Sequence, residues 1–401
     1  RDSSTSRGLG DVYKRQAQLC TKPALIPQAL LHYERGICAE DAFSAHGKRA
    51  FIMSHVLDMT GAPIVLVSAV PVLRSMGYEV LVLGPSDGGS LHLFLDAGAS
   101  VITRSSCRNV SDAWGMALCA DFVIANTVVM ARAVRALSGT AVPVLWWLHD
   151  AFAGYPHIAH QIPTQLGENV RVYSVGNHAA NAMRAVRPEF EIRPLIYGLP
   201  DYAAENFVCT DLGYNRGRPL FATVGSFERR KGHDIFCKAI RLLPPEVREK
   251  ASFLFVGQAA DKEMMDSVRA LTADYPENVY YCKRLTRDEI KSLMEQCTGL
   301  VCASRDDPMP TFVTEGLIFG KPSIVSEHTG TAGLISEGRN GFVYHNDDPQ
   351  QLAVLLEYAI EHPEELASMR TECRKMYEQY YSKEAFEQTL RAAVEDLTAK
   401  K

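Results

Sequence analysis

The chain has 401 residues, of which 47% are hydrophobic and 22% are charged, and its formal net charge is -5. This length suggests two globular domains, and the slightly acidic balance argues against nucleic acid as a partner. The apolar runs fall short of the roughly 20 residues that a helix needs to cross a bilayer, so we expect no spanning segment, while peripheral membrane association stays compatible with the sequence.

The start of the chain lacks the pattern of a folded domain. Residues 1–16 are polar and show no periodicity, and we interpret them as a non-native leader. Residues 17–48 carry helical fragments and are interpreted as the stump of an upstream domain, which would make the chain a fragment of a longer protein. We assign no function to either segment.

From residue 49 onward, short apolar runs alternate with helical stretches, which predicts βα units around mostly parallel sheets. The expected strands of the first half cover residues 49–55, 78–84, 99–103, 121–126, 143–150, 170–176 and 192–198. Those of the second half cover residues 219–226, 252–258, 279–285, 299–304, 322–327 and 341–347. Residues 349–398 are expected to form two helices.

These elements predict an α/β fold with two Rossmann-like, doubly wound domains that face a cleft. The first domain is expected over residues 49–198 and the second over residues 219–375, with a linker over 199–218, where Pro, Gly and Asn break the rhythm. Residues 376–401 are expected to pack back as a C-terminal helix. Ligands of such sheets bind outside the carboxyl ends of the strands, so the functional motifs should follow strands.

Two motifs of the first half follow expected strands. The segment SHVLDMTGAP leads into a helix through Gly61, which would let a ligand approach the backbone closely, although a plain βα turn explains the same pattern. His149 and Asp150 follow the apolar run PVLWWL and would face the cleft, although a lone loop histidine is more often structural. Trp146 and Trp147 are predicted to pack in the core.

The second half opens with the segment GSFERRKGHD, in which a strand ends at Gly225 and a helix follows Lys231 and Gly232. Unpaired backbone N–H groups and the helix dipole favour an anion at such a place, and Lys231 adds a full positive charge. We therefore predict a phosphate-binding loop. A solvated basic turn over residues 229–231 is the alternative, because Walker-type spacing is absent.

Basic residues follow a later strand of the second half. Lys283 and Arg284 stand where either contact with a ligand or a solvated turn fits the sequence. The stretch after them predicts a helix that is capped by Thr286, with Glu289 three positions on completing a capping box. We interpret this helix start as structural.

Two acids eight positions apart follow the expected strand at residues 299–304. Asp307 lies in a Pro-containing loop, and Glu315 is expected near the start of a helix, where a carboxylate is favoured and is able to accept hydroxyl hydrogen bonds from a ribose. A charged helix cap with an exposed loop acid is the alternative. The pair favours a binding site because it shares a sheet with the predicted phosphate loop.

With these motifs, residues 50–395 resemble the retaining, nucleotide-sugar-dependent glycosyltransferases of the GT-B architecture, in the large family four. The resemblance implies that the loop with Lys231 and Gly232 holds the donor diphosphate. It also implies that Asp307, which replaces a glutamate of the family, and Glu315 hold the donor sugar and the ribose.

The resemblance implies roles for further residues and marks one departure. Ser226 follows Gly225 where the family has an arginine, and Arg229 or Arg230 is expected to supply that charge. Gly61 would belong to the N-terminal glycine loop, His149 would lie beside the donor sugar, and Arg284 would contact the base or the phosphates.

The hypothesis is therefore transfer of a sugar from a UDP or GDP sugar to a hydroxyl of a glycan, lipid-linked or protein acceptor, with retention, in polysaccharide or glycoconjugate synthesis. The candidate catalytic residues are His149, Lys231, Asp307 and Glu315, without a cofactor or a metal ion. The expected location is cytoplasmic, and attachment to the inner face of the membrane is compatible with the sequence. A sugar-nucleotide epimerase and a catalytically silent GT-B binding module are the alternatives.

Cysteine and histidine usage supports no metal site. The ten cysteines are scattered without a CxxC pair and are interpreted as buried, reduced thiols. His157 and His160 lie near His149, but no cysteine, aspartate or glutamate completes a zinc-like set with them, so we interpret them as ordinary loop histidines.

Overall fold

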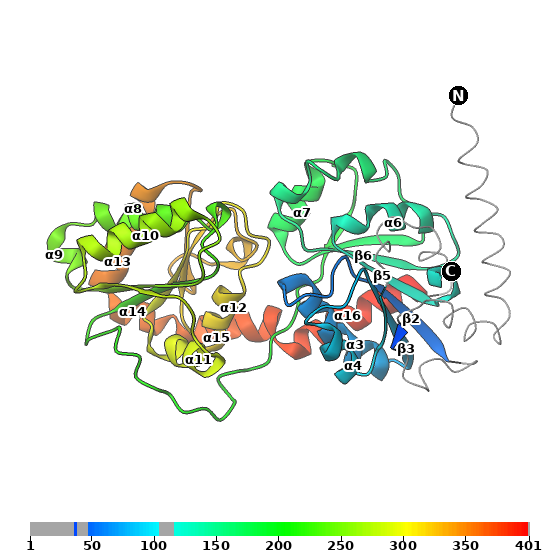
Figure 1. Cartoon of the computed structure of the whole chain (residues 1–401), viewed down its shortest axis with the longest axis horizontal. Coiled ribbons are helices and arrows are strands. Elements are labelled where there is room, and N and C mark those ends of the chain that lie inside the picture. Colours follow the sequence, from blue (N-terminus) through cyan, green and yellow to red (C-terminus); the bar gives the residue numbers. More distant parts are fainter. Residues whose placement is uncertain (1–35, 38–46, 104–115, 400–401) are drawn as a thin grey trace. The chain divides into compact units, whose positions relative to one another are not determined.

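The structure, a computed structural model, describes residues 36–37, 47–103 and 116–399 (Figure 1). The leader predicted over residues 1–16 and nearly all of the predicted upstream stump lie outside the described residues. The chain divides into two compact units. The first unit comprises the chain up to Val175, residues 179–198 and the chain from Phe386 onward, and the second comprises residues 176–178 and 199–385.

The first unit is built on a sheet of eight described strands in the order β1-β4-β3-β2-β5-β6-β7-β8. All neighbours are parallel except β1, which pairs antiparallel with β4. The strands are β1 (Gly36–Ile37), β2 (Lys48–Met53), β3 (Tyr78–Gly84), β4 (Ser100–Thr103), β5 (Phe122–Asn126), β6 (Val144–Leu148), β7 (Val170–Ser174) and β8 (Ile192–Pro194). The strand order reverses between β2 and β5, which places a topological switch point at these two strands.

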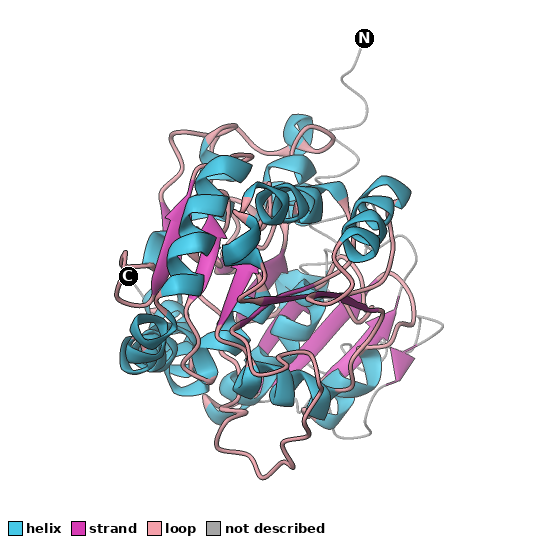
Figure 2. Cartoon of the chain, turned by 90° about the vertical axis from the view of Figure 1, so that its left-hand side faces the viewer, coloured by secondary structure: helices cyan, strands magenta, loops and turns pink. Residues whose placement is uncertain are grey.

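Helices flank the sheets of the chain (Figure 2), and the residues of β2 to β7 are nearly all buried. The helices of the first unit are α3 (Gly61–Ser75), α4 (Leu91–Asp96), α6 (Ala131–Leu137), most of α7 (Asn177–Arg184) and most of α16 (Lys383–Thr398), with short 3-10 turns between. Trp146 and Trp147 are fully buried, which confirms their predicted place in the core. The Trp147 ring stacks on Phe386 of α16 at 5.7 Å between ring centroids, so α16 forms part of this core.

The second unit is built on a sheet of six described parallel strands in the order β11-β10-β9-β12-β13-β14. The strands are β9 (Leu220–Val224), β10 (Ser252–Val256), β11 (Val279–Cys282), β12 (Gly299–Cys302), β13 (Ser323–Ser326) and β14 (Gly341–Tyr344). Its helices are α8 (His233–Leu242), α9 (Pro245–Arg248), α10 (Lys262–Asp274), α11 (Arg287–Gln296), α12 (Thr311–Ile318), α13 (Pro349–Glu361), α14 (Pro363–Ser368) and α15 (Arg370–Met376). The order reverses between β9 and β12.

Two sheets of parallel strands with helices on their faces confirm the predicted α/β class and the two Rossmann-like domains. The segment predicted as a linker, residues 199–218, belongs to the second unit. Within that unit Asp201 pairs with Arg374, and Glu205 pairs with Lys291 at 2.7 Å. In the described part of the chain, no helix combines the length and the apolarity that crossing a membrane requires.

The prediction of two helices over residues 349–398 is wrong. The segment forms α13, α14, α15, a π-helical turn over Tyr377–Tyr381 and α16. The backbone of His362, at the end of α13, lies outside the helical region. Pro363 explains this break, because proline lacks a backbone N–H and disfavours a helical conformation in the residue before it. The break ends α13 at Glu361, and α14 begins at Pro363.

Four of the described cysteines with a free thiol are buried, as the sequence suggested, whereas Cys209 is exposed and Cys282 is partly exposed. The buried ones are Cys237, Cys297, Cys302 and Cys373. Burial raises the pKa of the Cys237 thiol to about 12 and that of Cys302 to about 11. These thiols are therefore protonated, packed and unreactive at neutral pH.

Candidate functional site

The candidate site of the second unit lies at its switch point, where β9 and β12 are neighbours. The loop after β9 carries the predicted phosphate motif, and the loop after β12 carries Asp307. Because parallel strands end at the same edge of the sheet, both loops emerge side by side. The main chain joins them directly, since the N–H of Arg305 donates to the carbonyl of Arg230 at 2.8 Å.

Gly232 fixes how closely these two loops approach. Its φ is +66°, in the left-handed region, and a Cβ there would lie 1.8 Å from the carbonyl oxygen of Ala303. Only glycine combines that backbone conformation with that contact. Gly232 ends a 3-10 turn over Arg229–Lys231 and stands directly before α8, so it sets the entry of the chain into this helix.

Lys231 and Asp307 meet in this site. The Lys231 Nζ lies 2.5 Å from Oδ2 of Asp307, and the two side chains are 18% and 4% exposed. The other carboxylate oxygen of Asp307 accepts the N–H of Met309 at 3.3 Å, which fixes the orientation of the carboxylate. A cation and a carboxylate are thus held in one place, with Lys231 two residues before α8. The N–H groups of Ile235 and Phe236 donate to the carbonyl of Gly232, which leaves those of His233 and Asp234 without an acceptor among the described residues.

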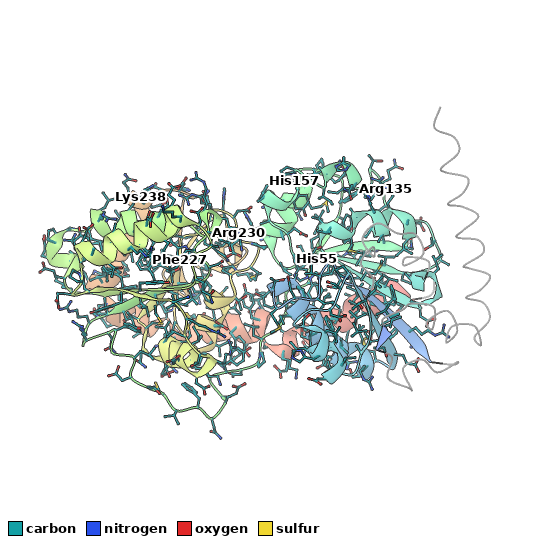
Figure 3. All side chains as sticks on the ribbon, in the orientation of Figure 1. His55, Arg135, His157, Phe227, Arg230 and Lys238 are labelled. Atoms are coloured by element: carbon teal, nitrogen blue, oxygen red, sulfur yellow. The ribbon has the colours of Figure 1, made fainter. Side chains whose placement is uncertain are left out.

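Glu228 organises the loop that precedes Lys231. Its carboxylate accepts hydrogen bonds from the hydroxyl of Ser226 and from Nε of Arg230, the latter at 2.8 Å. Burial raises the pKa of Glu228, but these two bonds, together with the charges of Arg230 and Lys231, outweigh burial and hold the pKa below its usual value. Arg230, which is labelled in Figure 3, is therefore engaged with Glu228. Gly225, at the start of this loop, is not required by packing, because an added Cβ there would meet nothing within 4 Å.

Arg305 holds the two loops together, although no motif in the sequence predicts this role. Its guanidinium forms a two-pronged pair with Asp234, the second residue of α8, with both N–O distances 2.8 Å. It also donates to the carbonyl of Arg229 at 2.8 Å and to Asp347. No local pattern marks Arg305, because its partners come from other loops of the sheet.

Glu315 lies in the second turn of α12, not near the helix start as the sequence suggested, because α12 begins at Thr311. Helix-end electrostatics therefore do not explain its charge. Its Oε1 instead lies 2.6 Å from a guanidinium nitrogen of Arg287, the first residue of α11. Burial raises the pKa of Glu315, and Arg287 counteracts this rise. The capping box of α11, with Thr286 and Glu289, is confirmed.

Arg284 lies in the exposed loop between β11 and α11. Among the described residues, its guanidinium takes part in no hydrogen bond or ion pair. Its predicted contact with the base or the phosphates stays a prediction.

In the first unit, His149 follows β6 and approaches the Trp147 ring with 4.6 Å between ring centroids. Burial and the nearby His55 lower the pKa of His149 to about 3, so the imidazole is neutral at pH 7. Its Nε2 atom is buried and finds no hydrogen-bond partner. Gly61 is the first residue of α3, and an added Cβ there would meet nothing within 4 Å. Both positions stay predictions as ligand contacts.

Three further polar side chains of the first unit, which follow β5 and β6 or end β5, were not predicted from the sequence. Asn126, at the end of β5, is fully buried with both amide atoms unpartnered, and the hydroxyls of Thr127 and Tyr155 are buried without a partner. Asp150 is engaged, because its carboxylate accepts the N–H of Val128 at 2.5 Å. Unpartnered buried polar atoms are costly, so a ligand or an ordered water is expected at these atoms.

The structure thus brings together some predicted residues and separates others. Lys231 and Asp307 are in contact, Ser226 and Arg230 share Glu228, and Glu315 pairs with Arg287, all within the second unit. His149 and Gly61 belong to the first unit. No group of three or more histidine, cysteine, aspartate or glutamate side chains in the described part of the chain is arranged to hold a metal ion.

Two protein-family models match the chain. Glycosyl-transferase family 4 matches residues 46–181, and glycosyl transferases group 1 matches residues 210–376. Together the two matched segments take up well over half of the chain. The first lies in the first unit except for residues 176–178, and the second lies within the second unit.

Curated relatives are distant. An uncharacterised glycosyltransferase of Methanocaldococcus jannaschii is 25% identical over 48% of this chain and 53% of its own length. Spore coat protein SA of Bacillus subtilis is 26% identical over 36% of this chain and 40% of its own length. The match thus spans about half the length of the first relative and less of the second.

Solved structures share the fold over nearly the whole chain. HepE of Anabaena, solved in complex with UDP and glucose, superimposes with a TM-score of 0.69 at 17% identity, over 88% of this chain and all of the other. WaaG, a glycosyltransferase involved in lipopolysaccharide biosynthesis, gives a TM-score of 0.66 at 16% identity, over 88% of this chain and all of the other. At sequence identities of 17% and 16%, the structural similarity shows that this chain shares their fold.

Proposed function

Because the chain belongs to the glycosyltransferases of the GT-B, family-four type, we propose that it transfers a sugar from a nucleoside diphosphate sugar to an acceptor hydroxyl. The observation that carries this proposal is the 2.5 Å contact between Lys231 and Asp307 at the switch point of the second sheet. It joins a cation at a helix start with a buried carboxylate, which suit a diphosphate and a sugar hydroxyl respectively.

In the proposed reaction, negative charge grows on the diphosphate as the glycosidic bond breaks. Lys231 and the backbone N–H groups at the start of α8 stabilise this charge by fixed electrostatics, so we assign this role to them rather than to a metal ion. Arg230 reaches the diphosphate only if it leaves Glu228. Ser226, bonded to the same carboxylate, does not replace the missing arginine of the family pattern.

The acids of the site take the remaining roles. Asp307 orients a hydroxyl of the donor sugar, and Glu315 accepts the ribose hydroxyls. The base of the donor is uracil or guanine; UDP is the first choice because HepE was solved with UDP. We further propose retention at the anomeric carbon, an acceptor that is a glycan, a lipid-linked sugar or a protein, and a cytoplasmic location.

Lys231→Ala tests the phosphate role. We expect turnover of the donor to fall about 100-fold or more, because one preorganised group that stabilises transition-state charge is worth that much. The rate is measured with UDP-glucose, UDP-galactose and GDP-mannose against a panel of glycan acceptors, and the melting temperature is measured in parallel. Lys238→Ala on α8 is the matched control, since this lysine is 60% exposed and its removal should leave turnover unchanged.

Normal turnover by Lys231→Ala would show that the phosphate assignment is wrong. Release of an isomerised sugar from the donor alone would favour the epimerase. Binding of UDP or GDP without turnover of any donor would favour the silent binding module.

A further inference from the structure

Arg287 and Glu315 form an ion pair beside an aromatic ring in the second unit. A guanidinium nitrogen of Arg287 lies 2.6 Å from Oε1 of Glu315. The guanidinium carbon of Arg287 also lies 3.8 Å from the centre of the Tyr202 ring, within the range of a cation–π interaction. The arginine is thus fixed from two sides, although its side chain is 47% exposed.

Glu315 needs such a partner because it is buried. Its side chain is 11% exposed, on a helix whose residues from Phe312 to Ile318 are all buried. A buried carboxylate without a partner takes up a proton instead of staying charged. Burial raises the pKa of Glu315 in this way, and Arg287 acts against the rise.

Other cations near α12 are engaged elsewhere. Arg374 of α15, which packs against α12, pairs with Asp201 and donates to the carbonyl of Ile318. Lys231 pairs with Asp307. Among the described residues, Arg287 is therefore the cation that compensates the charge of Glu315.

The pairing leaves one carboxylate oxygen for a ligand. Arg287 binds Oε1, and Oε2 of Glu315 accepts no hydrogen bond from the described residues. A charged carboxylate only accepts hydrogen bonds, so vicinal hydroxyls are suitable donors to it, whereas a protonated carboxyl loses part of this capacity.

We propose that Arg287 is a positioning residue that keeps Glu315 charged and in one orientation, and thereby makes the site select nucleotides with a ribose. This inference rests on the proposed function, because it takes Glu315 as the group that binds the donor ribose. Arg287 itself acts through Glu315 and not through direct contact with the nucleotide.

The experiment measures nucleotide affinity by calorimetry between pH 5.5 and 8.5. UDP and GDP are compared with 2′,3′-dideoxy-UDP, for the wild-type chain, Arg287→Ala, Arg287→Lys and Glu315→Gln. Arg269→Ala on α10 is the control for loss of one positive charge, because Arg269 is 68% exposed and pairs only at 3.8 Å with Asp266. Melting temperatures show whether each variant is folded.

We expect Arg287→Ala to lose about 10-fold in affinity for the ribonucleotide at pH 5.5, the value of one charge-assisted hydrogen bond, and less at pH 8.5. The sign follows from the pKa of Glu315: without Arg287 it rises further, so the carboxylate is protonated as the pH falls. Discrimination against the dideoxynucleotide should shrink in parallel. Arg287→Lys should restore part of the affinity.

A double variant separates direct from indirect action. In Glu315→Gln, which has no charge to maintain, adding Arg287→Ala should change affinity less than 2-fold, about 0.4 kcal/mol. An unchanged effect of Arg287→Ala in that background, or a loss that is equal at every pH, would overturn the inference. If the wild-type chain binds neither UDP nor GDP, the proposed function itself fails.

Discussion

At the scale of single residues, Gly232 has the most restricted position in the candidate site. Its backbone lies in the left-handed region and touches the carbonyl of Ala303. Gly61 offers a contrast, because an added Cβ there would meet nothing within 4 Å. These two glycines of the predicted site thus differ in kind: packing requires glycine at position 232, whereas a side chain at position 61 would enter open space.

Gly232→Ala should therefore destabilise the chain. We expect a loss of about 2 kcal/mol or more in the free energy of unfolding, since the strain of a positive φ adds to the collision with a backbone atom. Chemical denaturation followed by circular dichroism measures the loss. Gly61→Ala is the matched control and should leave the free energy of unfolding unchanged or raise it by up to about 1 kcal/mol, because alanine is the better helix former and meets open space there. Equal effects of the two variants would contradict this view of Gly232.

His233, the first residue of α8, makes stability depend on pH. Burial and the charge of Lys231 lower its pKa to about 3, against the ordinary 6.5. Below pH 6.5 the unfolded chain binds a proton that the folded chain refuses until about pH 3, so stability is lost as the pH falls through this window. The expected loss from this group between pH 7 and pH 5 is about 1 to 2 kcal/mol.

Thermal denaturation at pH 7, 6 and 5 tests this prediction. His233→Gln should show a smaller fall in melting temperature than the wild-type chain. The melting temperature of His157→Gln should fall as much as that of the wild-type chain, because His157 lies in an exposed loop of the first unit (Figure 3). A His233→Gln profile that parallels the wild-type profile would show that His233 is not the group responsible.

At the scale of elements, the site depends on how the loop after β12 holds the turn before α8. Arg305 makes this connection, because it pairs with Asp234 and donates to the carbonyl of Arg229. The turn carries Lys231, so its position depends on an arginine far away in the sequence. Arg305 is thus a structural support of the predicted phosphate loop.

Arg305→Lys should loosen this turn. A lysine keeps the positive charge, but its single amine is unable to donate to both carboxylate oxygens of Asp234 and to the carbonyl of Arg229 at the same time. We expect about 2 kcal/mol of lost stability and a weaker affinity for UDP, measured by denaturation and calorimetry. Arg269→Lys serves as the exposed control. An Arg305→Lys variant with wild-type stability and affinity would show that the turn before α8 keeps its position without Arg305.

At the scale of the whole molecule, the charged candidates for the diphosphate and the ribose all belong to the second unit. Hydrogen exchange of the full chain with and without UDP tests this distribution. We expect slower exchange in peptides that cover residues 225–232 and 303–316, because bound phosphate and ribose engage these loops. Strand β10 is the internal control. Slower exchange confined to the first unit would contradict the assignment.

The sequence by itself determined the elements that depend on neighbours along the chain. The alternation of apolar runs and helical stretches located the strands, from β2 to β14, and the α/β class. The capping box at Thr286 and the burial of Trp146 and Trp147 also followed from short patterns. These features depend on backbone periodicity and local hydrogen bonds, which a few consecutive residues specify.

Only the tertiary structure decided which charges meet. Arg305 lies 71 residues from Asp234, and Arg287 lies 28 residues from Glu315. Each arginine has other acids at similar sequence distances, so spacing does not select the partner. The folded sheet selects it, because the strand order places particular loop ends side by side and burial makes an unpaired charge costly.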